Sequence, residues 1–149
     1  MRSVPLDNES LLPVRWRTSP RSFVALMALY ESNHIRLGAL AGDLRQLPAR
    51  LASQVTGDCE LVLTVTERTP YTTGFNLTYW LERPAMDVRE AVPDMLVRVY
   101  HDARVAECTG FSAGRSPVER ELDQRWARNV MLNKWLEYCA DRGHRFATR

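Results

Sequence analysis

The sequence predicts an α+β domain in which a four-stranded, mainly antiparallel sheet carries two long helices on one face. Two observations lead to this fold class. Apolar residues recur with the helical period near both ends of the chain, whereas apolar and polar residues alternate in four segments between them. Two amphipathic helices and a sheet with one apolar face can bury one another, so the expected order is α-β-β-β-β-α.

The first helix is expected to begin at Ser19-Pro20, with serine as the N-cap and proline in the first turn. Its apolar stripe continues to Leu44, and Pro48 ends the pattern. His34 lies on this stripe. Its imidazole is either a core or boundary side chain or a buried proton-transfer group.

The strands are expected in two hairpins. Residues 59–68 and 74–82 alternate and are joined by the turn-forming stretch "TPYTT". The second hairpin is built around "VRVYHDARVAE", residues 97–107. A last helix follows, with a capping box at Ser116–Glu119, and it should run to about Arg142, where Gly143 is placed to stop it.

The register of the second hairpin follows from the face on which each side chain must lie, because a slip of one residue moves every side chain to the other face. A loop of four residues, 101–104, places Arg98 opposite Glu107 and Tyr100 opposite Val105. Opposite charges that face each other across strands stabilise a hairpin by roughly 0.2–1 kcal/mol. His101 and Asp102 are then turn-forming residues, or His101 is a general base or ligand contact as well.

The outer face of the sheet is expected to carry Trp80, Arg98 and Tyr100, which are residue types that anchor interfaces and stack on planar ligands. Three explanations remain for this face: the chain itself covers it, a protein partner or a second copy contacts it, or it binds a small ligand.

Composition excludes several classes. The chain has 149 residues, which suits one core, and residues 19–149 are expected to form a single domain behind a loosely ordered arm at 1–18. Twenty basic and 18 acidic residues give a net charge of +2, too even for nucleic-acid binding. There is no apolar run of membrane-spanning length. Three scattered cysteines fit a reduced, cytoplasmic protein, and no metal-ligand spacing or cofactor motif occurs.

The chain resembles the YqiB-like family of bacterial proteins, a domain of unknown function. The resemblance covers about residues 20–143, but not the N-terminal arm, and it weakens over 110–121. It is carried by "LYESN" with Glu31 and Asn33, "TPYTT" with Tyr71, "VRVYHDARVAE", "WLEYC" with Trp135 and Tyr138, and also Asp123 and Asn129. His34 stands where the family has an aromatic residue, which favours its core role. Genes of this family often lie near genes for nucleotide-hydrolysing enzymes, so the resemblance implies a nucleotide-related role.

Two functions are compatible with the sequence. The first is a non-enzymatic binding or regulatory module, because no phosphate loop, nucleophile elbow or catalytic set is recognisable. Its partner would be a protein, a second copy or a small ligand. The second is a small enzyme, hydrolytic or nucleotide-related, that uses His101 with Glu107, Arg98 or Tyr71. The candidate binding residues are Arg98, Tyr100, His101, Glu107, Trp80 and Tyr71.

Overall fold

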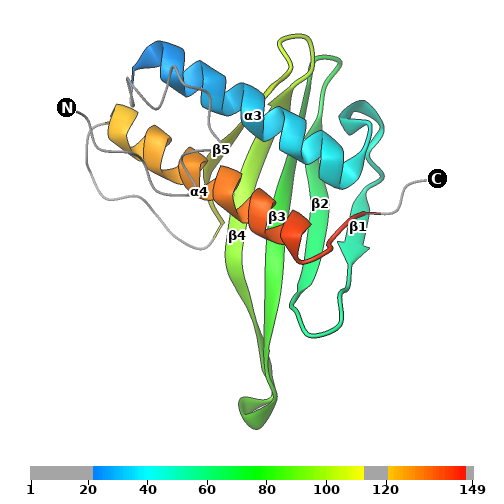
Figure 1. Cartoon of the computed structure of the whole chain (residues 1–149). Coiled ribbons are helices and arrows are strands. Elements are labelled where there is room, and N and C mark those ends of the chain that lie inside the picture. Colours follow the sequence, from blue (N-terminus) through cyan, green and yellow to red (C-terminus); the bar gives the residue numbers. More distant parts are fainter. Residues whose placement is uncertain (1–21, 113–120, 147–149) are drawn as a thin grey trace.

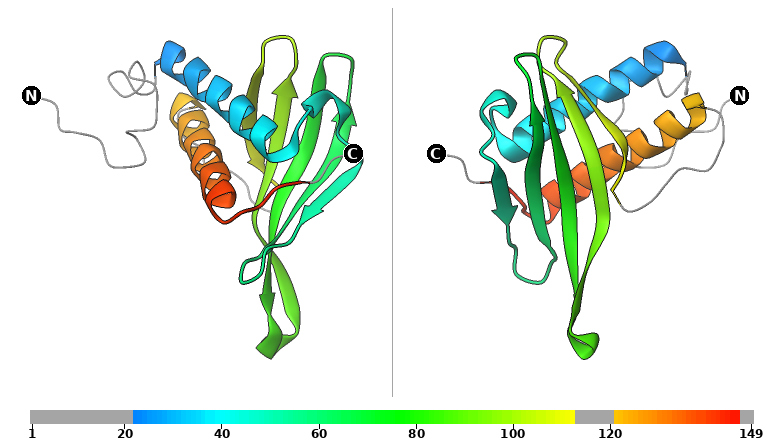
Figure 2. Two further views of the ribbon diagram at one scale, coloured as in Figure 1. Left: turned by 45° about the vertical axis from the view of Figure 1, so that its right-hand side comes forward. Right: turned by 180° about the vertical axis from the view of Figure 1, so that it is seen from behind.

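A computed structural model describes residues 22–112 and 121–146. Five antiparallel strands form one sheet in the order β1-β2-β3-β4-β5, and two helices, α3 and α4, lie against one of its faces (Figure 1). The view from behind shows the other face with both helices beyond the sheet (Figure 2). The predicted arm at 1–18 and the predicted capping box at Ser116–Glu119 lie outside the described residues.

The α+β class and the antiparallel sheet are confirmed, but the prediction of four strands is wrong. The additional strand is β1, Arg50–Ser53, which pairs with β2. Four residues are too few to establish an alternating pattern, and these begin two positions after Pro48, where a helix was expected to end. The other four strands are β2 (Glu60–Arg68), β3 (Thr72–Arg83), β4 (Val88–Tyr100) and β5 (Val105–Phe111).

Helix α3 spans Phe23–Ala41 and is shorter at both ends than predicted. Ser22 is its N-cap, because the Ser22 hydroxyl accepts the Ala25 N–H at 3.0 Å, and the predicted cap at Ser19 lies outside the described residues. At the other end Gly42 adopts a φ of 79°, which ends the helix before Pro48 is reached. The next residues form the short 3-10 helix η1, Leu44–Gln46.

Helix α4 spans Glu121–Asp141, and the predicted stop at Gly143 is confirmed. Gly143 has a φ of 95°, and its N–H donates to Ala140 O, while the His144 N–H donates to Cys139 O, both at 3.0 Å. This pair of bonds is the Schellman arrangement. It turns the chain sharply, so that His144 lies beside β1 and bonds with Ser53.

The main core lies between the sheet and the helices. Alternate residues of the central strands point into it and are almost fully buried: Leu61, Leu63, Phe75, Leu77, Met95, Val97 and Val99. Leu37, Leu132 and Leu136 of the helices pack against them. A second cluster joins the first half of α3 to Val105 of β5. Burial on this scale is the main driving force for the fold.

Side-chain amides of the helices cover the free edge of β5. Asn129 of α4 accepts the Cys108 N–H through Oδ1 at 2.7 Å and donates to Cys108 O at 3.3 Å. Asn33 of α3 donates to Ala106 O at 3.2 Å and to Asn129 Oδ1 at 3.3 Å. Asn133 donates in turn to Asn33 Oδ1 at 3.0 Å. The backbone groups of an edge strand are thereby satisfied inside the protein.

The β3–β4 hairpin extends well beyond the rest of the sheet and forms a projecting arm (Figures 1 and 2). Its tip is the 3-10 helix η2, Pro84–Met86, followed by Asp87 in the left-handed region at φ 56°. Met86 is 69% exposed at the tip. The charges of the arm pair with each other, as Arg83 does with Glu90 at 2.7 Å. The arm therefore presents an apolar tip on a charge-balanced stem.

Candidate functional site

The predicted register of the β4–β5 hairpin is confirmed. Arg98 lies opposite Glu107, and Tyr100 lies opposite Val105, on either side of a four-residue turn at 101–104. The Tyr100 hydroxyl donates to Glu107 Oε2 at 2.8 Å. Arg98 forms an ion pair of 3.3 Å with Glu67 as well, although both side chains are about half exposed and such pairs contribute little.

Part of this outer surface is covered by the chain itself. Val105 is buried in a cluster with Leu29 of α3, and Tyr100 packs against the same cluster. Burial and the neighbouring Glu107 carboxylate raise the pKa of Tyr30 to about 12. Tyr100 and Glu107 are thus held in an internal network and are not freely available for a ligand. A contact of this face with a protein partner or a second copy stays a prediction.

Trp80 lies far from the Arg98–Tyr100–Glu107 group. It is paired with Glu60 and Ala91, whereas Tyr100 is paired with Thr72 near the opposite end of β3. At about 3.4 Å per residue, the eight positions between Thr72 and Trp80 correspond to roughly 27 Å. The predicted residues therefore do not form one patch, because each group lies at a different end of the sheet.

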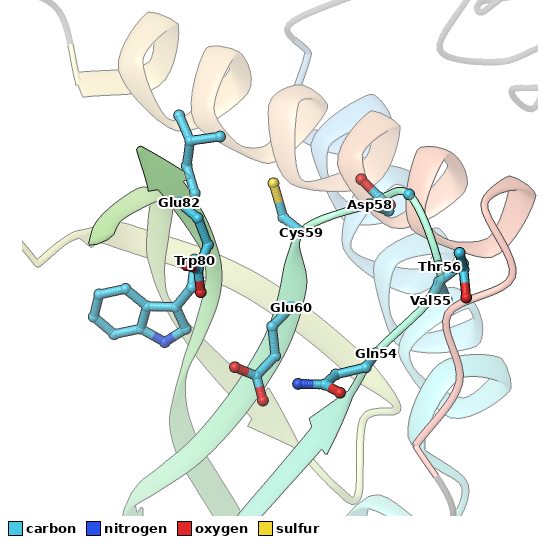
Figure 3. Close-up of a pocket in the computed structure, with 10 residues that line it drawn as sticks. Gln54, Val55, Thr56, Asp58, Cys59, Glu60, Trp80 and Glu82 are labelled. Atoms are coloured by element: carbon cyan, nitrogen blue, oxygen red, sulfur yellow. The ribbon is translucent and has the colours of Figure 1, made fainter. Parts of the chain in front are cut away.

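Trp80 belongs to an open pocket of about 640 Å³ at the base of the arm (Figure 3). The loop 54–59 and residues 80–82 form its walls. The Arg89 guanidinium lies 4.9 Å from the centre of the Trp80 ring and pairs with Glu60 at 2.7 Å and with Glu82 at 3.3 Å. Burial and the neighbouring Asp58 raise the pKa of the Cys59 thiol. The charges here are already paired and the thiol is a poor nucleophile.

A network of hydrogen bonds adjoins this pocket and includes Asp58 of its wall. His144 Nε2 is 2.9 Å from Asp58 Oδ2, and His144 Nδ1 is 2.9 Å from Ser53 Oγ. The Tyr79 hydroxyl also donates to Asp58, at 2.7 Å. Since a carboxylate only accepts, the Nε2–H of His144 is the donor to Asp58.

The three residue types match the set that performs acyl transfer, but Ser53 is only 6% exposed and also accepts the Arg145 N–H. Burial by itself would raise the pKa of Asp58. The hydrogen bonds from Tyr79, the Cys59 amide and His144 outweigh burial and lower it below the usual value. These hydrogen bonds therefore hold His144 and Arg145 against Ser53 of β1 and against Asp58 in the loop that follows β1.

His101 lies on the helix side of the sheet. It is 7% exposed, and its Nε2 is 2.9 Å from the hydroxyl of Thr73, which is buried on β3. Its backbone N–H donates to Tyr71 O at 2.9 Å, so the predicted loop residue Tyr71 adjoins the turn, but the Tyr71 side chain is 65% exposed. Asp102, which follows His101, is exposed and pairs with Arg45 at 3.3 Å.

His101 helps to line a cavity of about 240 Å³ between the 101–104 turn and the C-terminal end of α3. We refer to it as the histidine–arginine cavity. Its lining comprises two imidazoles, two guanidiniums, two glycines, a carboxylate and a leucine: His34, His101, Arg45, Arg104, Gly38, Gly42, Asp43 and Leu44. A Cβ atom added at Gly38 would meet nothing within 4 Å, so the glycine leaves open space there.

Arg104 adopts a φ of 56°, and its N–H closes the turn by donating to Tyr100 O at 2.9 Å. Its guanidinium makes no ion pair or hydrogen bond with any residue that the structure describes. Arg45 by contrast is tied to Asp102. Of the two guanidiniums that line the cavity, the exposed one of Arg104 therefore has no described partner, and it carries five N–H donors in a planar fork.

The surroundings of the cavity lower the pKa of both of its histidines. Burial, then His101 and Arg104, lower the pKa of His34. Burial and Arg45 lower the pKa of His101, against opposing contributions from Asp43 and Asp102. These surroundings therefore favour the neutral form of both imidazoles, which has one N–H donor and one acceptor nitrogen.

Of the residues predicted to act with His101, Tyr71 adjoins it, but Arg98 and Glu107 do not. His101 lies beside α3 and η1, whereas Arg98 and Glu107 lie on the outer side of the hairpin. Among residues 22–112 and 121–146, no group of three or more His, Cys, Asp or Glu is placed to hold a metal ion. In the same part of the chain, no helix combines the length and apolar character needed to cross a membrane.

Sequence reasoning missed most of this cavity. His34 and His101 are 67 positions apart, and Arg45 and Arg104 carry no motif. The sequence singles out His101 by its turn and His34 by its place on the apolar stripe, but it does not indicate that the two lie together. The Ser53–His144–Asp58 network was missed because β1 was not predicted and because His144 follows the last expected element.

Comparison with known proteins confirms the resemblance seen in the sequence. A family profile described as "Protein of unknown function (DUF1249)" matches residues 36–145. The "Uncharacterized protein YqiB" of Escherichia coli strain K12 is 33% identical over 130 residues, which cover 81% of this chain and 90% of that protein. The proteins of the same description from E. coli O6:H1 and O157:H7 give the same figures. No solved structure matches the chain.

Proposed function

Because the chain belongs to the protein family of unknown function DUF1249, we propose its function from its own geometry: it is a non-enzymatic binding module for a small anionic ligand. The ligand is held in the histidine–arginine cavity. The observation that carries this proposal is the uncommitted Arg104 guanidinium beside a 240 Å³ cavity that two imidazoles also line.

Two features support the cavity over the outer face. Tyr100 and Glu107 bond to each other, so a ligand would have to displace an existing contact. At the cavity, the exposed Arg104 offers donors that no described residue uses, and hydrogen bonds from a guanidinium to an anion are roughly twice as strong as those between neutral groups. The volume is below the roughly 300–1,000 Å³ of pockets for drug-sized ligands, which favours a small ligand or the charged end of a larger one.

The separation of the titratable groups supports binding rather than catalysis. His101 has Thr73 as its hydrogen-bond partner and no described carboxylate hydrogen-bonded to its ring. A general base is normally oriented by such a partner and placed within reach of the group that it deprotonates. The predicted alternative, an enzyme using His101 with Glu107, has less support because the two residues lie on different sides of the hairpin.

Thermal denaturation in the presence of inorganic phosphate and nucleoside monophosphates tests the proposal. We expect these anions to raise the melting temperature of the wild type and to lose most of this effect in Arg104→Met. The matched control is Arg50→Met, which removes an exposed arginine on β1, away from the cavity. Because such anions also stabilise proteins generally, the comparison between the two variants, at constant ionic strength, isolates the site. Equal stabilisation of both variants would contradict the proposal.

A further inference from the structure

The fixed charges around the histidine–arginine cavity cancel. Arg45 and Arg104 supply two positive charges, while Asp43 in the wall and Asp102, which pairs with Arg45, supply two negative ones. The Asp43 carboxylate also accepts the backbone N–H of Arg45 at 2.9 Å. The C-terminal end of α3 adds partial negative charge. An anion that enters the cavity therefore needs positive charge that these groups do not provide.

The two histidines are the groups that can supply it. In the free protein burial and the nearby guanidiniums favour the neutral imidazoles, as described above. An anion between them offsets the repulsion from Arg45 and Arg104 and favours the protonated rings. His101 is suitably connected, because its Nε2 bonds to Thr73, and its Nδ1 has no hydrogen-bond partner among the described residues. A protonated His101 can bond to Thr73 and to a ligand together.

We infer that the cavity binds a tetrahedral dianion, of the phosphate monoester or sulfate class, and that His34 and His101 each take up a proton from solvent when it binds. This inference rests on the proposed function. Two protonated imidazoles balance the two charges of a dianion. Arg104 donates to the ligand oxygens through its fork of N–H groups, and His101 donates through Nδ1–H. Binding therefore becomes tighter as the pH falls.

The chain has only three histidines, so their imidazole proton resonances in NMR spectra provide a direct test. Sulfate is the probe, because it remains a dianion throughout the titration from pH 5.5 to 8. Chloride keeps the ionic strength constant. We expect sulfate to raise the apparent pKa of His34 and His101. His144 is the internal control, because it is bonded to Asp58 and Ser53 and lies outside the cavity.

The affinity for sulfate should rise with acidification, by up to tenfold per pH unit for each proton taken up. Arg104→Met should weaken binding, and Arg50→Met should not. His101→Asn should reduce the pH dependence of the affinity, and the remaining resonances show whether this variant is folded.

Three results overturn parts of the reasoning separately. Sulfate binding with unchanged histidine pKa values rejects proton uptake and leaves the proposed function standing. Binding of the dicarboxylate succinate but not of sulfate or phosphate rejects the tetrahedral class. If no anion changes the chemical shifts of His34 and His101 at any pH, none enters the cavity, and both this inference and the proposed function are rejected.

Discussion

Replacing Asn129 by alanine should destabilise the protein severely, because this side chain completes the edge of β5. Asn129 and Cys108 are both fully buried. The Asn129 side-chain oxygen accepts the backbone N–H of Cys108 at 2.7 Å. In the Asn129→Ala variant that N–H keeps no acceptor. Cys108 O by contrast is still bonded by Arg128 Nε at 3.0 Å, and Asn33 still reaches Ala106 O. The main loss is therefore one buried backbone donor.

The magnitude follows from two contributions. A buried donor without a partner costs about 1–3 kcal/mol. Removal of the amide group leaves a cavity that costs about 1 kcal/mol more. The free energy of unfolding should fall by roughly 2–4 kcal/mol, a large part of the roughly 5–15 kcal/mol that is typical of a domain. Asn133→Ala is the matched control, since Asn133 is nearly as buried on the same helix but, among the described residues, its side chain bonds only to the side chains of Ser32 and Asn33.

Urea denaturation followed by circular dichroism gives the free energy of unfolding and the m-value for both variants. Hydrogen exchange of the Cys108 amide reports on the edge itself, and exchange should be faster in Asn129→Ala than in Asn133→Ala. The reasoning is refuted if Asn129→Ala loses no more stability than the control, or if exchange of the Cys108 amide is unchanged.

Two further predictions concern Asp58 and the cysteines. The pKa of Asp58 is lowered in the folded protein, so its contribution to stability is present above the unfolded pKa of about 3.9 and is lost as the pH falls through the folded pKa. Asp58→Asn should therefore reduce the free energy of unfolding at pH 7 more than at pH 3, and equal losses at the two pH values would contradict this assignment. A thiol reagent should modify Cys59 first in the native protein, because Cys108 and Cys139 are fully buried and burial raises their thiol pKa to about 11 and about 12. Equal native reaction rates for all three would show that the helices do not seal the core.

The hairpin could be predicted in detail because its information is local. Alternation around the 101–104 turn and the charges of Arg98 and Glu107 select one register, and that register is present. The contacts of Asn33 and Asn129 could not be predicted. Both residues interrupt apolar stripes, but their bond joins positions 96 apart in the chain, and nothing in either helix specifies a strand edge as the partner.

The candidate site was predictable only in part for the same reason. His101 was marked by its turn, but the groups that complete the cavity come from α3 and η1. The position of η1, Leu44–Gln46, depends on the end of α3 at Gly42, because the chain leaves the helix there. A helix that continued to Pro48, as the apolar stripe indicated, would not have formed this wall.

The asparagine cover of β5 also has a consequence for synthesis of the chain. The five strands pair in sequence order, so the sheet can form while the ribosome is still making the rest of the protein. Asn33 is present from the start, but Asn129 lies 21 residues after Cys108. During that interval the Cys108 backbone groups lack Asn129, and a partly uncovered strand edge is the kind of surface that recruits strands from other chains. We therefore expect ribosome-bound fragments ending before α4 to aggregate or to bind chaperones.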